Sequence, residues 1–512
     1  MAKMKRLQSV AIANRGEVAV RIIHACHELG LRTVLLHSEA DVQTRAYRMA
    51  DTRICIGPAA TAESYLSIER NVNGALAGKA DAVHPGFGFL SENAAFAQAV
   101  MDAGLLFVGP KPESIRAVGD KIAAKKTIAS AKAPSVPGYM GEDQRIETLV
   151  EEAAKIGFPV IVKAAAGGGG RGMKVIRSRA EAVDQISSAQ REGLSAFGSS
   201  VVFLEKYLDR AKHIEFQIFG DASGDVSYLL ERECSVQRRH QKIIEEALSA
   251  TLTPELRKAM GETAVRLAQS AGYEGAGTVE FLLQDGNFYF LEMNTRLQVE
   301  HPVTEMVLGV DLVKAQILNA AKEFRVWPQE SIVPHGHAIE ARIYAENPYA
   351  GGIPSMGKIL GVKWPDGPGR RFETGIDSGD EITSFYDPMI AKVIVWDETR
   401  LRAIKKLKTT LSQSLVLGVH TNIPFVKEMI SHPEFIDASM TTQFVEKYFS
   451  EGLRPRERSA TELEFQKRAL DVVSNEGAAD AGTSLAASRT ATATWFSGAG
   501  SAGPSSSGWS NT

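Results

Sequence analysis

The residues best suited to chemistry lie in the segment 278–294. Two apolar runs there flank Asp285-Gly286-Asn287, a pattern typical of a β-hairpin with a short, glycine-containing turn. If these three residues form the turn, Glu280 faces Glu292 directly across the two strands. Because side chains alternate along a strand, Asn294 then lies on the same face as Glu292. The spacing therefore brings two carboxylates and an amide together.

Two carboxylates at directly opposed positions of a sheet repel each other. A hard divalent cation would offset that repulsion. Two carboxylates with an amide oxygen suit Mg²⁺, or Mn²⁺ in its place, with water and substrate phosphates completing the coordination. The alternative is a pair of solvated glutamates on an edge hairpin. The spacing favours a metal site at Glu280, Glu292 and Asn294.

Polar residues continue at every second position from Glu292 to Glu300, with Arg296 and Gln298 between them. A solvated strand would show the same alternation. An arginine between two amide side chains, followed by a glutamate beside a metal site, is also the arrangement of an anion pocket with a base.

A glycine-rich loop at 167–173 lies between two strand-like segments. It contains a GxGxxG pattern, but a strand-like segment follows it where a dinucleotide fold needs a helix, and no Walker A lysine is present. Such a loop can cover phosphates with backbone N–H groups, and Lys163 before it could neutralise their charge. A mobile hairpin tip would fit equally well. Residues 205–208 follow another apolar strand and suit adenine recognition or an ordinary charged strand end.

The elements that would hold these residues indicate several domains. With 512 residues, 44% of them hydrophobic and 23% charged, the chain is ordinary in composition but too long for one core. A strand at 10–13, a helix at 17–29 and a strand at 33–36 predict an open parallel α/β domain at the N-terminus. Strand signals dominate from 158 to 230, and helices are expected at 254–271, 309–321 and 399–413.

The bulk composition excludes several classes of protein. A net charge of −3 implies no polyelectrolyte partner, so nucleic acid is not expected. No segment approaches the roughly 20 apolar residues of a membrane span. Three scattered cysteines and no signal peptide indicate a reducing compartment, and a cytoplasmic location is expected. The Gly-, Ala-, Ser- and Thr-rich tail from about residue 475 is expected to be disordered.

Taken together, these motifs resemble the ATP-grasp superfamily and, within it, the biotin carboxylases. The resemblance covers about residues 5 to 450. Its motifs are the segments 12–19, 84–93, 167–173, 233–242, 292–302, 336–342 and 386–392. The segment 340–346 is most similar to alpha subunits of acyl-CoA carboxylases. Two positions depart from the family pattern, since Leu248 stands where proline is usual and Phe87 where tyrosine is common.

The resemblance implies a multidomain α/β and α+β fold. Residues 1–118 would form a Rossmann-like N-terminal domain and 119–335 an ATP-grasp domain, with a mobile glycine-rich lid at about 135–207. Residues 336–450 would form a mixed α+β C-terminal domain, and 451–512 a tail.

The resemblance also implies roles for individual residues. ATP would be bound by Lys121, Lys163, Gly169, Gly170, Glu205, Lys206, Tyr207, Leu208, His213, Gln237, His240, Glu280 and Glu292. The metal would be held by Glu280, Glu292 and Asn294, in agreement with the hairpin argument. Bicarbonate would be bound by Lys242, Arg296, Gln298 and Val299. Glu300 would be the base that deprotonates bicarbonate, and Arg342 would contact the ureido oxygen of biotin.

The implied reaction is ATP-dependent carboxylation of biotin with bicarbonate through carboxyphosphate, the first half-reaction of an acyl-CoA or pyruvate carboxylase. The sequence contains no Ala/Val-Met-Lys-Met site for biotin, so the biotin carboxyl carrier and the carboxyltransferase are expected on other chains. The resemblance also suggests a homodimer. Two rival functions are a different ATP-grasp ligase, such as a carbamoyl phosphate synthase or a purine-pathway carboxylase, and a non-catalytic assembly subunit.

Overall fold

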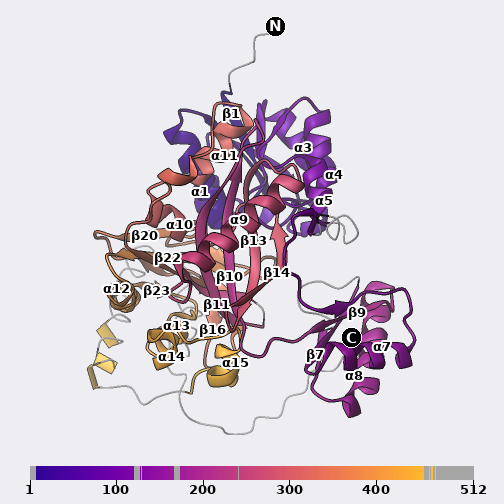
Figure 1. The fold of residues 1–512 in the computed structure, drawn as a ribbon. Coiled ribbons are helices and arrows are strands. Elements are labelled where there is room, and N and C mark those ends of the chain that lie inside the picture. The colour runs from indigo at the N-terminus through magenta and orange to yellow at the C-terminus, as the bar shows by residue number, and fades with distance from the viewer. Residues whose placement is uncertain are drawn as a thin grey trace, which may run out of the picture.

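A computed structural model of the chain describes residues 7–119, 127–128, 130–165, 173–239, 241–454, 460–461, 463–464 and 467–468. Of the predicted site residues, Lys121, Gly169, Gly170 and His240 lie outside the described residues, as does the tail from 475. Figure 1 shows the N-terminal unit at one end of a long central sheet and a small unit of strands and helices standing apart beside it.

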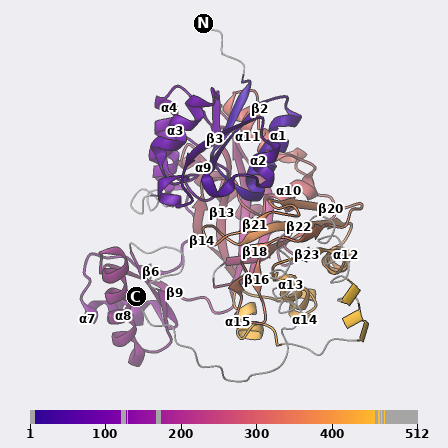
Figure 2. The same cartoon turned by 180° about the vertical axis from the view of Figure 1, so that it is seen from behind.

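The N-terminal unit is built on a five-stranded parallel sheet with strand order β3-β2-β1-β4-β5. Its strands are β1 (Ser9–Ile12), β2 (Arg32–Ser38), β3 (Thr52–Gly57), β4 (Ala82–His84) and β5 (Leu106–Phe107). Its helices are α1 (Gly16–Glu28), α2 (Arg45–Met49), α3 (Ile68–Ala77), α4 (Ala94–Asp102) and α5 (Pro112–Gly119), and Figure 2 shows this unit from behind. The predicted strand, helix and strand at 10–36 are confirmed. Gly30, with φ at +69°, follows the first helix.

The small unit is a four-stranded antiparallel sheet with order β6-β9-β7-β8. Its strands are β6 (Gly138–Tyr139), β7 (Val160–Ala164), β8 (Met173–Ile176) and β9 (Val202–Lys206). Two helices that the sequence analysis missed, α7 (Ile146–Ile156) and α8 (Arg179–Phe197), also belong to this unit. Much of the buried surface of α8 comes from Ala182, Ile186 and Ala189, a helical spacing that small residues make inconspicuous.

The central sheet has eight strands in the order β14-β13-β10-β11-β12-β15-β22-β20. They are β10 (Lys212–Gly220), β11 (Val226–Arg238), β12 (Gln241–Ala247), β13 (Gly275–Gln284), β14 (Asn287–Asn294), β15 (His337–Tyr344), β20 (Arg370–Thr374) and β22 (Met389–Asp397). Neighbouring strands are antiparallel. Because β15, β20 and β22 follow residue 336, the predicted central and C-terminal domains share one sheet.

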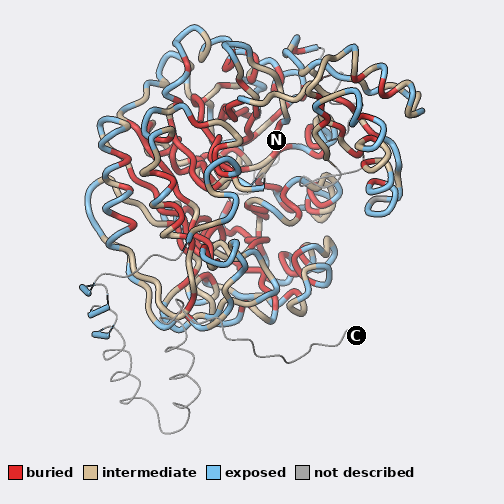
Figure 3. The backbone as a smooth tube through the Cα atoms, turned by 90° about the horizontal axis from the view of Figure 1, so that it is seen from below, coloured by how far each residue is buried: buried red, intermediate tan, exposed pale blue. Residues whose placement is uncertain are grey.

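Helices and short strands complete the molecule. The helices are α9 (Pro254–Ser270), α10 (His301–Leu308), α11 (Leu312–Ala320), α12 (Arg400–Gln413), α13 (Ile423–Met429), α14 (Pro433–Ile436) and α15 (Phe444–Phe449). The short strands are β16 (Glu346–Asn347), β17 (Ile353–Pro354), β18 (Gly357–Lys358), β19 (Gly361–Lys363), β21 (Glu381–Ile382) and β23 (Leu415–Leu417). Figure 3 shows buried chain concentrated in the interior, with exposed chain around the outside.

The turn of the β13–β14 hairpin differs from the predicted one. Gln284 pairs with Asn287, so the turn has the two residues Asp285 and Gly286, both with positive φ (51° and 78°). This is the geometry of a type I′ turn, for which Asp-Gly is a preferred pair. A register shift beyond Phe281 inserts one extra residue in β14. Glu280 therefore still pairs with Glu292, as predicted, although the turn is one residue shorter.

Among the residues that the structure describes, no helix is both long and apolar enough to span a bilayer. Cys26 and Cys234 are buried, Cys55 is exposed, and all three are free thiols.

Candidate active site

A row of charged residues crosses the central sheet. Glu292 on β14 pairs with Glu280 on β13, which pairs with Glu215 on β10, which pairs with Arg232 on β11. Glu215, Glu280 and Arg232 are buried, whereas Glu292 is exposed at the end of the row. Three carboxylates in adjacent register positions need positive charge close by, because like charges directly opposed in a sheet repel.

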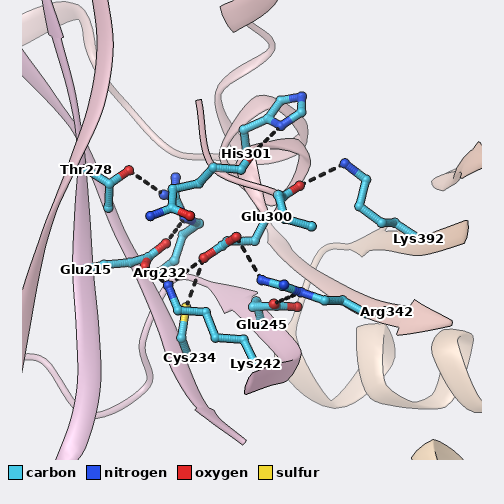
Figure 4. A network of polar contacts seen from close by, with 12 residues as sticks. Glu215, Arg232, Cys234, Lys242, Glu245, Thr278, Glu300, His301, Arg342 and Lys392 are labelled. Atoms are coloured by element: carbon cyan, nitrogen blue, oxygen red, sulfur yellow. Dashed lines mark hydrogen bonds and ion pairs between the residues drawn. The ribbon is translucent and has the colours of Figure 1, made fainter. Parts of the chain in front are cut away.

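Lys242 on β12 supplies part of that charge (Figure 4). Its ammonium Nζ lies 2.9 Å from Oε1 of Glu280 and 2.7 Å from Oε1 of Glu300, and it also binds Glu215 closely. Burial lowers the pKa of Lys242, but the three carboxylates outweigh burial and raise that pKa well above its ordinary value. Lys242 is therefore a charged lysine. It joins Glu300 to the row of glutamates Glu292, Glu280 and Glu215, here called the acid row.

Glu280 is held by several donors as well as by Lys242. Its Oε2 lies 2.7 Å from Nε2 of His213, and its Oε1 accepts from Nδ2 of Asn294 at 2.9 Å and from Nε2 of Gln298 at 3.3 Å. Burial opposes ionisation, but Lys242 and His213 bring the pKa of Glu280 well below its usual range. The carboxylate is therefore ionised and fixed in place.

Glu292 has different surroundings. Desolvation and then the charge of Glu280 raise the pKa of its carboxyl group. Among the described residues, potential metal-ligand atoms of His213, Glu215 and Glu280 lie within 4.8 Å of one another. Two of the predicted metal ligands, Glu280 and Asn294, are in direct contact. The third, Glu292, lies at the next register position with an exposed side chain that is available to a ligand.

Glu300 lies directly before α10 and is fully buried. Its Oε2 accepts from Nη2 of Arg342 at 3.0 Å, and Nε of Arg342 donates to Oε1 of Glu245 at 2.6 Å. Burial raises the pKa of Glu300, but Lys242, Arg342 and Arg232 together bring it well below its ordinary value. Figure 4 shows Lys242 and Arg342 approaching this carboxylate from different strands. Glu300 is thus a charged proton acceptor placed between two cations.

The strand β14 ends at Asn294, so the polar alternation up to Glu300 continues in a loop. In this loop Arg296 donates from Nε to Oε2 of Glu92 at 2.8 Å and from Nη1 to Oε1 of Gln298 at 3.0 Å. Glu92 belongs to the N-terminal unit, so two units of the chain set the orientation of this guanidinium group. The segment is a fixed loop that carries a cation, as an anion pocket requires.

The remaining described ATP-site residues fall into two places. The first place is the central sheet, where Nδ1 of His213 lies 2.6 Å from Nε2 of Gln237 and Nε2 of His213 lies 2.7 Å from Glu280.

The second place is the small unit and the residues that directly follow it, which contain Lys163, Glu205, Lys206, Tyr207 and Leu208. Lys163 binds Glu205 closely, and the hydroxyl of Tyr207 accepts from Nε2 of Gln443 at 3.0 Å. Lys206 donates to the carbonyls of Gly157 and Phe158 at 2.7 and 2.9 Å, so its ammonium group braces the small unit.

Four residues that hold the predicted site residues in place had no role predicted from the sequence: Glu215, Arg232, Glu245 and Glu92. One signal was present for Glu215. His213, Glu215 and Gln217 alternate along β10 with apolar residues, which indicates a polar face inside the molecule. Arg232 binds Glu215, Gln217 and Thr278 at 2.5, 2.7 and 3.0 Å. Its burial could not be inferred from its local sequence.

This arrangement defines what the site can do. Lys242 and Arg342 both contact the Glu300 carboxylate, and Arg296, bonded to Gln298, adds a third cation in the preceding loop. Glu280 and Glu292, paired across β13 and β14, add carboxylate oxygens of the kind that divalent cations bind together with phosphates. The site therefore suits phosphoryl transfer to a small oxyanion.

Three protein-family models match the chain. They are the biotin carboxylase N-terminal domain at 6–115, the ATP-binding domain of the carbamoyl-phosphate synthase L chain at 120–323, and the biotin carboxylase C-terminal domain at 340–447. The two flanking matches separate this chain from the carbamoyl phosphate synthases, which were a rival interpretation of the sequence.

Similar proteins of two lengths are known. Biotin carboxylase from Nostoc sp. is 46% identical over 86% of this chain and 99% of its own length. A pyruvate carboxylase subunit from Methanothermobacter thermautotrophicus is 48% identical over 86% of this chain and 89% of its own. The alpha subunit of mitochondrial methylcrotonoyl-CoA carboxylase from Dictyostelium discoideum is 46% identical over 86% of this chain, and the chain spans only 64% of that relative.

Solved structures of biotin carboxylases are also similar to this chain. Biotin carboxylase from Campylobacter jejuni, in a beta-gamma-ATP complex, has a TM-score of 0.83 and 41% identity over 86% of this chain and 99% of its own. The biotin carboxylase domain dimer of Hydrogenobacter thermophilus 2-oxoglutarate carboxylase, solved with MgADP, ADP and bicarbonate, has a TM-score of 0.82 and 44% identity over 87% and 98%. Matches of this identity over almost the full length of biotin carboxylases, on a fold with the same three units, show that this chain belongs to the biotin carboxylase family of ATP-grasp enzymes.

Proposed function

We propose that this protein carboxylates biotin, using ATP and bicarbonate, as the first half-reaction of an acyl-CoA or pyruvate carboxylase. The observation that carries the proposal is the position of Glu300, buried between Lys242 and Arg342 and joined through Lys242 to the acid row. One continuous network of ion pairs thus joins the proposed base for bicarbonate, Glu300, to the proposed cation for biotin, Arg342, and to the glutamates proposed to bind Mg²⁺ and the phosphates of ATP.

The first step would be activation of bicarbonate. Lys242, Arg296, Gln298 and Val299 would bind the anion, and Glu300 would take its proton. The bicarbonate oxygen would then attack the γ-phosphorus of ATP, giving carboxyphosphate and ADP. Glu300 is a weak base while two cations hold it. A bicarbonate anion that shares Lys242 would weaken that ion pair and raise the basicity of Glu300.

ATP would lie between the small unit and the central sheet. Lys163 and residues 205–208 would act from the small unit, and His213 and Gln237 from the sheet, with the proposed Lys121, Gly169, Gly170 and His240 completing the site. Glu280, Glu292 and Asn294 would hold Mg²⁺, or Mn²⁺, whose charge would stabilise the transferring phosphoryl group. The donor set fits, because it offers only hard oxygens and Glu292 is open to a ligand.

Arg342 would act on biotin. Carboxyphosphate would break into CO2 and inorganic phosphate, the phosphate would take the ureido N–H proton, and the ureido nitrogen would bond to the carbon of CO2. The guanidinium group of Arg342, oriented by Glu245 and Glu300, would stabilise the enolate charge on the ureido oxygen during this step. We further propose that a biotin carboxyl carrier presents the substrate, that a carboxyltransferase consumes the product, and that the enzyme is a homodimer. The relatives named as carboxylase subunits and the solved dimer support these partners. Three free cysteines suit the cytoplasm that we propose for it.

We also propose the limits 1–118, 119–335 and 336–450 for the functional domains, with 135–207 as a lid over ATP. The matched family models have similar limits, and the small unit stands apart from the central sheet in Figure 1.

The test is ATP cleavage by the purified protein, measured with and without bicarbonate and free biotin. Bicarbonate-dependent cleavage that rises with biotin is expected. Arg342→Ala should bind ATP normally but carboxylate biotin about 100-fold more slowly, since the removed group acts in the transition state. Arg370→Ala, which removes an arginine bonded to the carbonyl of Asp366, is the matched control. A normal rate in Arg342→Ala would refute the assignment of this residue.

A further inference from the structure

Lys392 on β22 is fully buried, which is rare for a lysine. Its Nζ donates to the carbonyl oxygen of Val299 at 2.8 Å and lies 3.2 Å from Oε2 of Glu17. The same ammonium lies 5.8 Å from the centre of the Phe87 ring. These contacts join the C-terminal part of the central sheet to the loop before α10 and to the N-terminal unit.

The contacts with the N-terminal unit lie at the topological switch point of its parallel sheet. Glu17 is in the first turn of α1, which follows β1, and Phe87 follows β4. β1 and β4 are neighbours where the strand order changes direction, β3-β2-β1 on one side and β4-β5 on the other. Open parallel sheets bind ligands at the carboxyl ends of such strands. Here the ammonium of Lys392 lies between the segments that follow those two strands.

Lys392 and Arg342 act on the same loop. They pair directly across β15 and β22, so their side chains leave the same face of the sheet. Lys392 binds the carbonyl of Val299, and Arg342 binds the carboxylate of the next residue, Glu300. Figure 4 shows both side chains reaching toward this segment from the same side. The proposed base is therefore held through its backbone by one cation and through its side chain by another.

The charge of Lys392 is paired with the carboxylate of Glu17. Burial raises the pKa of Glu17 to about 7, and Lys392 is the largest influence that opposes it. A hydrogen bond from a charged donor to a carbonyl is stronger than a neutral one, so Lys392 constrains Val299 more firmly than a neutral side chain would. Glu17 of the N-terminal unit thus stabilises the charge of Lys392. Lys392 in turn holds the loop 295–300, here called the bicarbonate loop because its residues are proposed to bind bicarbonate.

We propose that Lys392 is a positioning residue for bicarbonate activation, fixing the Val299–Glu300 segment with Glu17 as its counter-ion. This inference rests on the proposed roles of Val299 and Glu300. Lys392 acts through the loop, since its ammonium group contacts the carbonyl of Val299, the carboxylate of Glu17 and the ring of Phe87.

The kinetic test uses Lys392→Met, which keeps the length and removes the charge. We expect kcat/KM for bicarbonate to fall about 100-fold, because small displacements of catalytic groups cost that much, while KM for ATP changes less than about twofold. The control is Lys406→Met. Lys406 also donates to a carbonyl, that of Trp396 at 2.8 Å, and pairs with Asp397 at 3.0 Å, and among the described residues its polar contacts all lie outside the loop 295–300. An equal loss in both variants would overturn the inference.

A double variant separates positioning from packing. Lys392→Met leaves Glu17 buried without its partner, so its Tm should fall. Adding Glu17→Gln removes the buried carboxyl group that has lost its partner, and the Tm should recover in part. The bicarbonate kinetics should stay impaired, because Val299 still lacks its donor. Recovery of kcat/KM together with the Tm would show that Lys392 acts only through stability and would overturn the inference.

Hydrogen exchange tests the geometry without any turnover. The amides of His301 and Val303 donate to the carbonyls of Gln298 and Glu300, both at 3.3 Å. In Lys392→Met these amides should exchange faster, whereas in Lys406→Met they should match the wild-type protein. Unchanged exchange in Lys392→Met would overturn the positioning role whatever the kinetics show. Absence of bicarbonate-dependent ATP cleavage in the wild-type protein would instead count against the proposed function.

Discussion

Glu280 and Glu292 are paired residues of the same type, yet their surroundings make them different groups. Glu280 is buried and ionised by Lys242 and His213, whereas Glu292 is exposed and its pKa is raised. Protein cations thus offset part of the repulsion that first suggested a metal at this hairpin. The remaining negative charge belongs to Glu292, the member of the pair that a ligand can reach.

Removing the charge of Glu292 should therefore affect the metal and leave the fold unchanged. Glu292→Gln is expected to lose metal-dependent ATP cleavage by about 100-fold or more, because a neutral amide in place of a carboxylate weakens binding of a hard divalent cation and the positioning of the phosphoryl group. The measurement is ATP cleavage over a range of Mg²⁺ concentrations, with circular dichroism to check folding.

The matched control is Asp285→Asn, which removes one carboxylate from the tip of the same hairpin. Asp285 is exposed, and asparagine tolerates its positive φ of 51°. Wild-type metal dependence in Glu292→Gln would exclude this carboxylate as a ligand.

At the scale of elements, ion pairs join strands to helices. Glu246 on β12 lies 2.7 Å from Nε2 of His337 on β15, and it accepts from Nε and Nη2 of Arg400 on α12 at 2.7 and 3.0 Å. Burial opposes its ionisation, but the hydrogen bond from His337 and then Arg400 lower the pKa of Glu246 from 4.5 to about 2. One carboxylate therefore connects three elements beside the site.

This pairing should make stability depend on pH. Because its pKa is lowered in the folded state, Glu246 contributes its full stabilisation above about pH 4.5 and loses it as the pH falls toward 2. The contribution at neutral pH is on the order of 3 kcal/mol. Glu246→Gln should therefore lower the Tm most at neutral pH, and the difference from wild type should narrow in acid.

The measurement is thermal unfolding of both proteins across that pH range. Glu262→Gln, at an exposed helical glutamate 3.8 Å from Lys258, should change little at any pH. A Tm difference for Glu246→Gln that does not vary with pH would contradict the proposed ion pair.

At the scale of the whole molecule, the central sheet collects the site. Strands from 212–220 to 389–397 place Lys242, Arg342 and Lys392 on neighbouring strands. The N-terminal unit adds Glu92 and Glu17 from outside that sheet. The small unit carries the proposed ATP residues separately, which is the arrangement expected of a lid.

The proposed homodimer can be tested on the intact protein. Light scattering after gel filtration should give twice the chain mass of 55.4 kDa, because a biotin carboxylase domain of 44% identity was solved as a dimer. A mass of one chain at assay concentrations would contradict the homodimer and leave the catalytic proposal unaffected.

The sequence alone determined the family and the presence of the hairpin that carries Glu280 and Glu292. Alternation of side chains and the turn signal at Asp285-Gly286 are local properties, so a hairpin could be predicted. The pairing of Glu280 with Glu292 was predicted correctly from a three-residue turn, because in the structure a two-residue turn and one extra residue in β14 give the same pairing. The bulge that restores this register, and the helices α7 and α8, were missed because their signals are weak in the local sequence.

Only the tertiary structure decided what surrounds those residues. Lys242 contacts Glu215, Glu280 and Glu300, which come from different elements, and no local pattern states which strands become neighbours. The partners that set each charge are distant in the chain, as Lys392 and Glu17 show. Ionisation depends on burial and on nearby charges, and both are properties of the packed molecule.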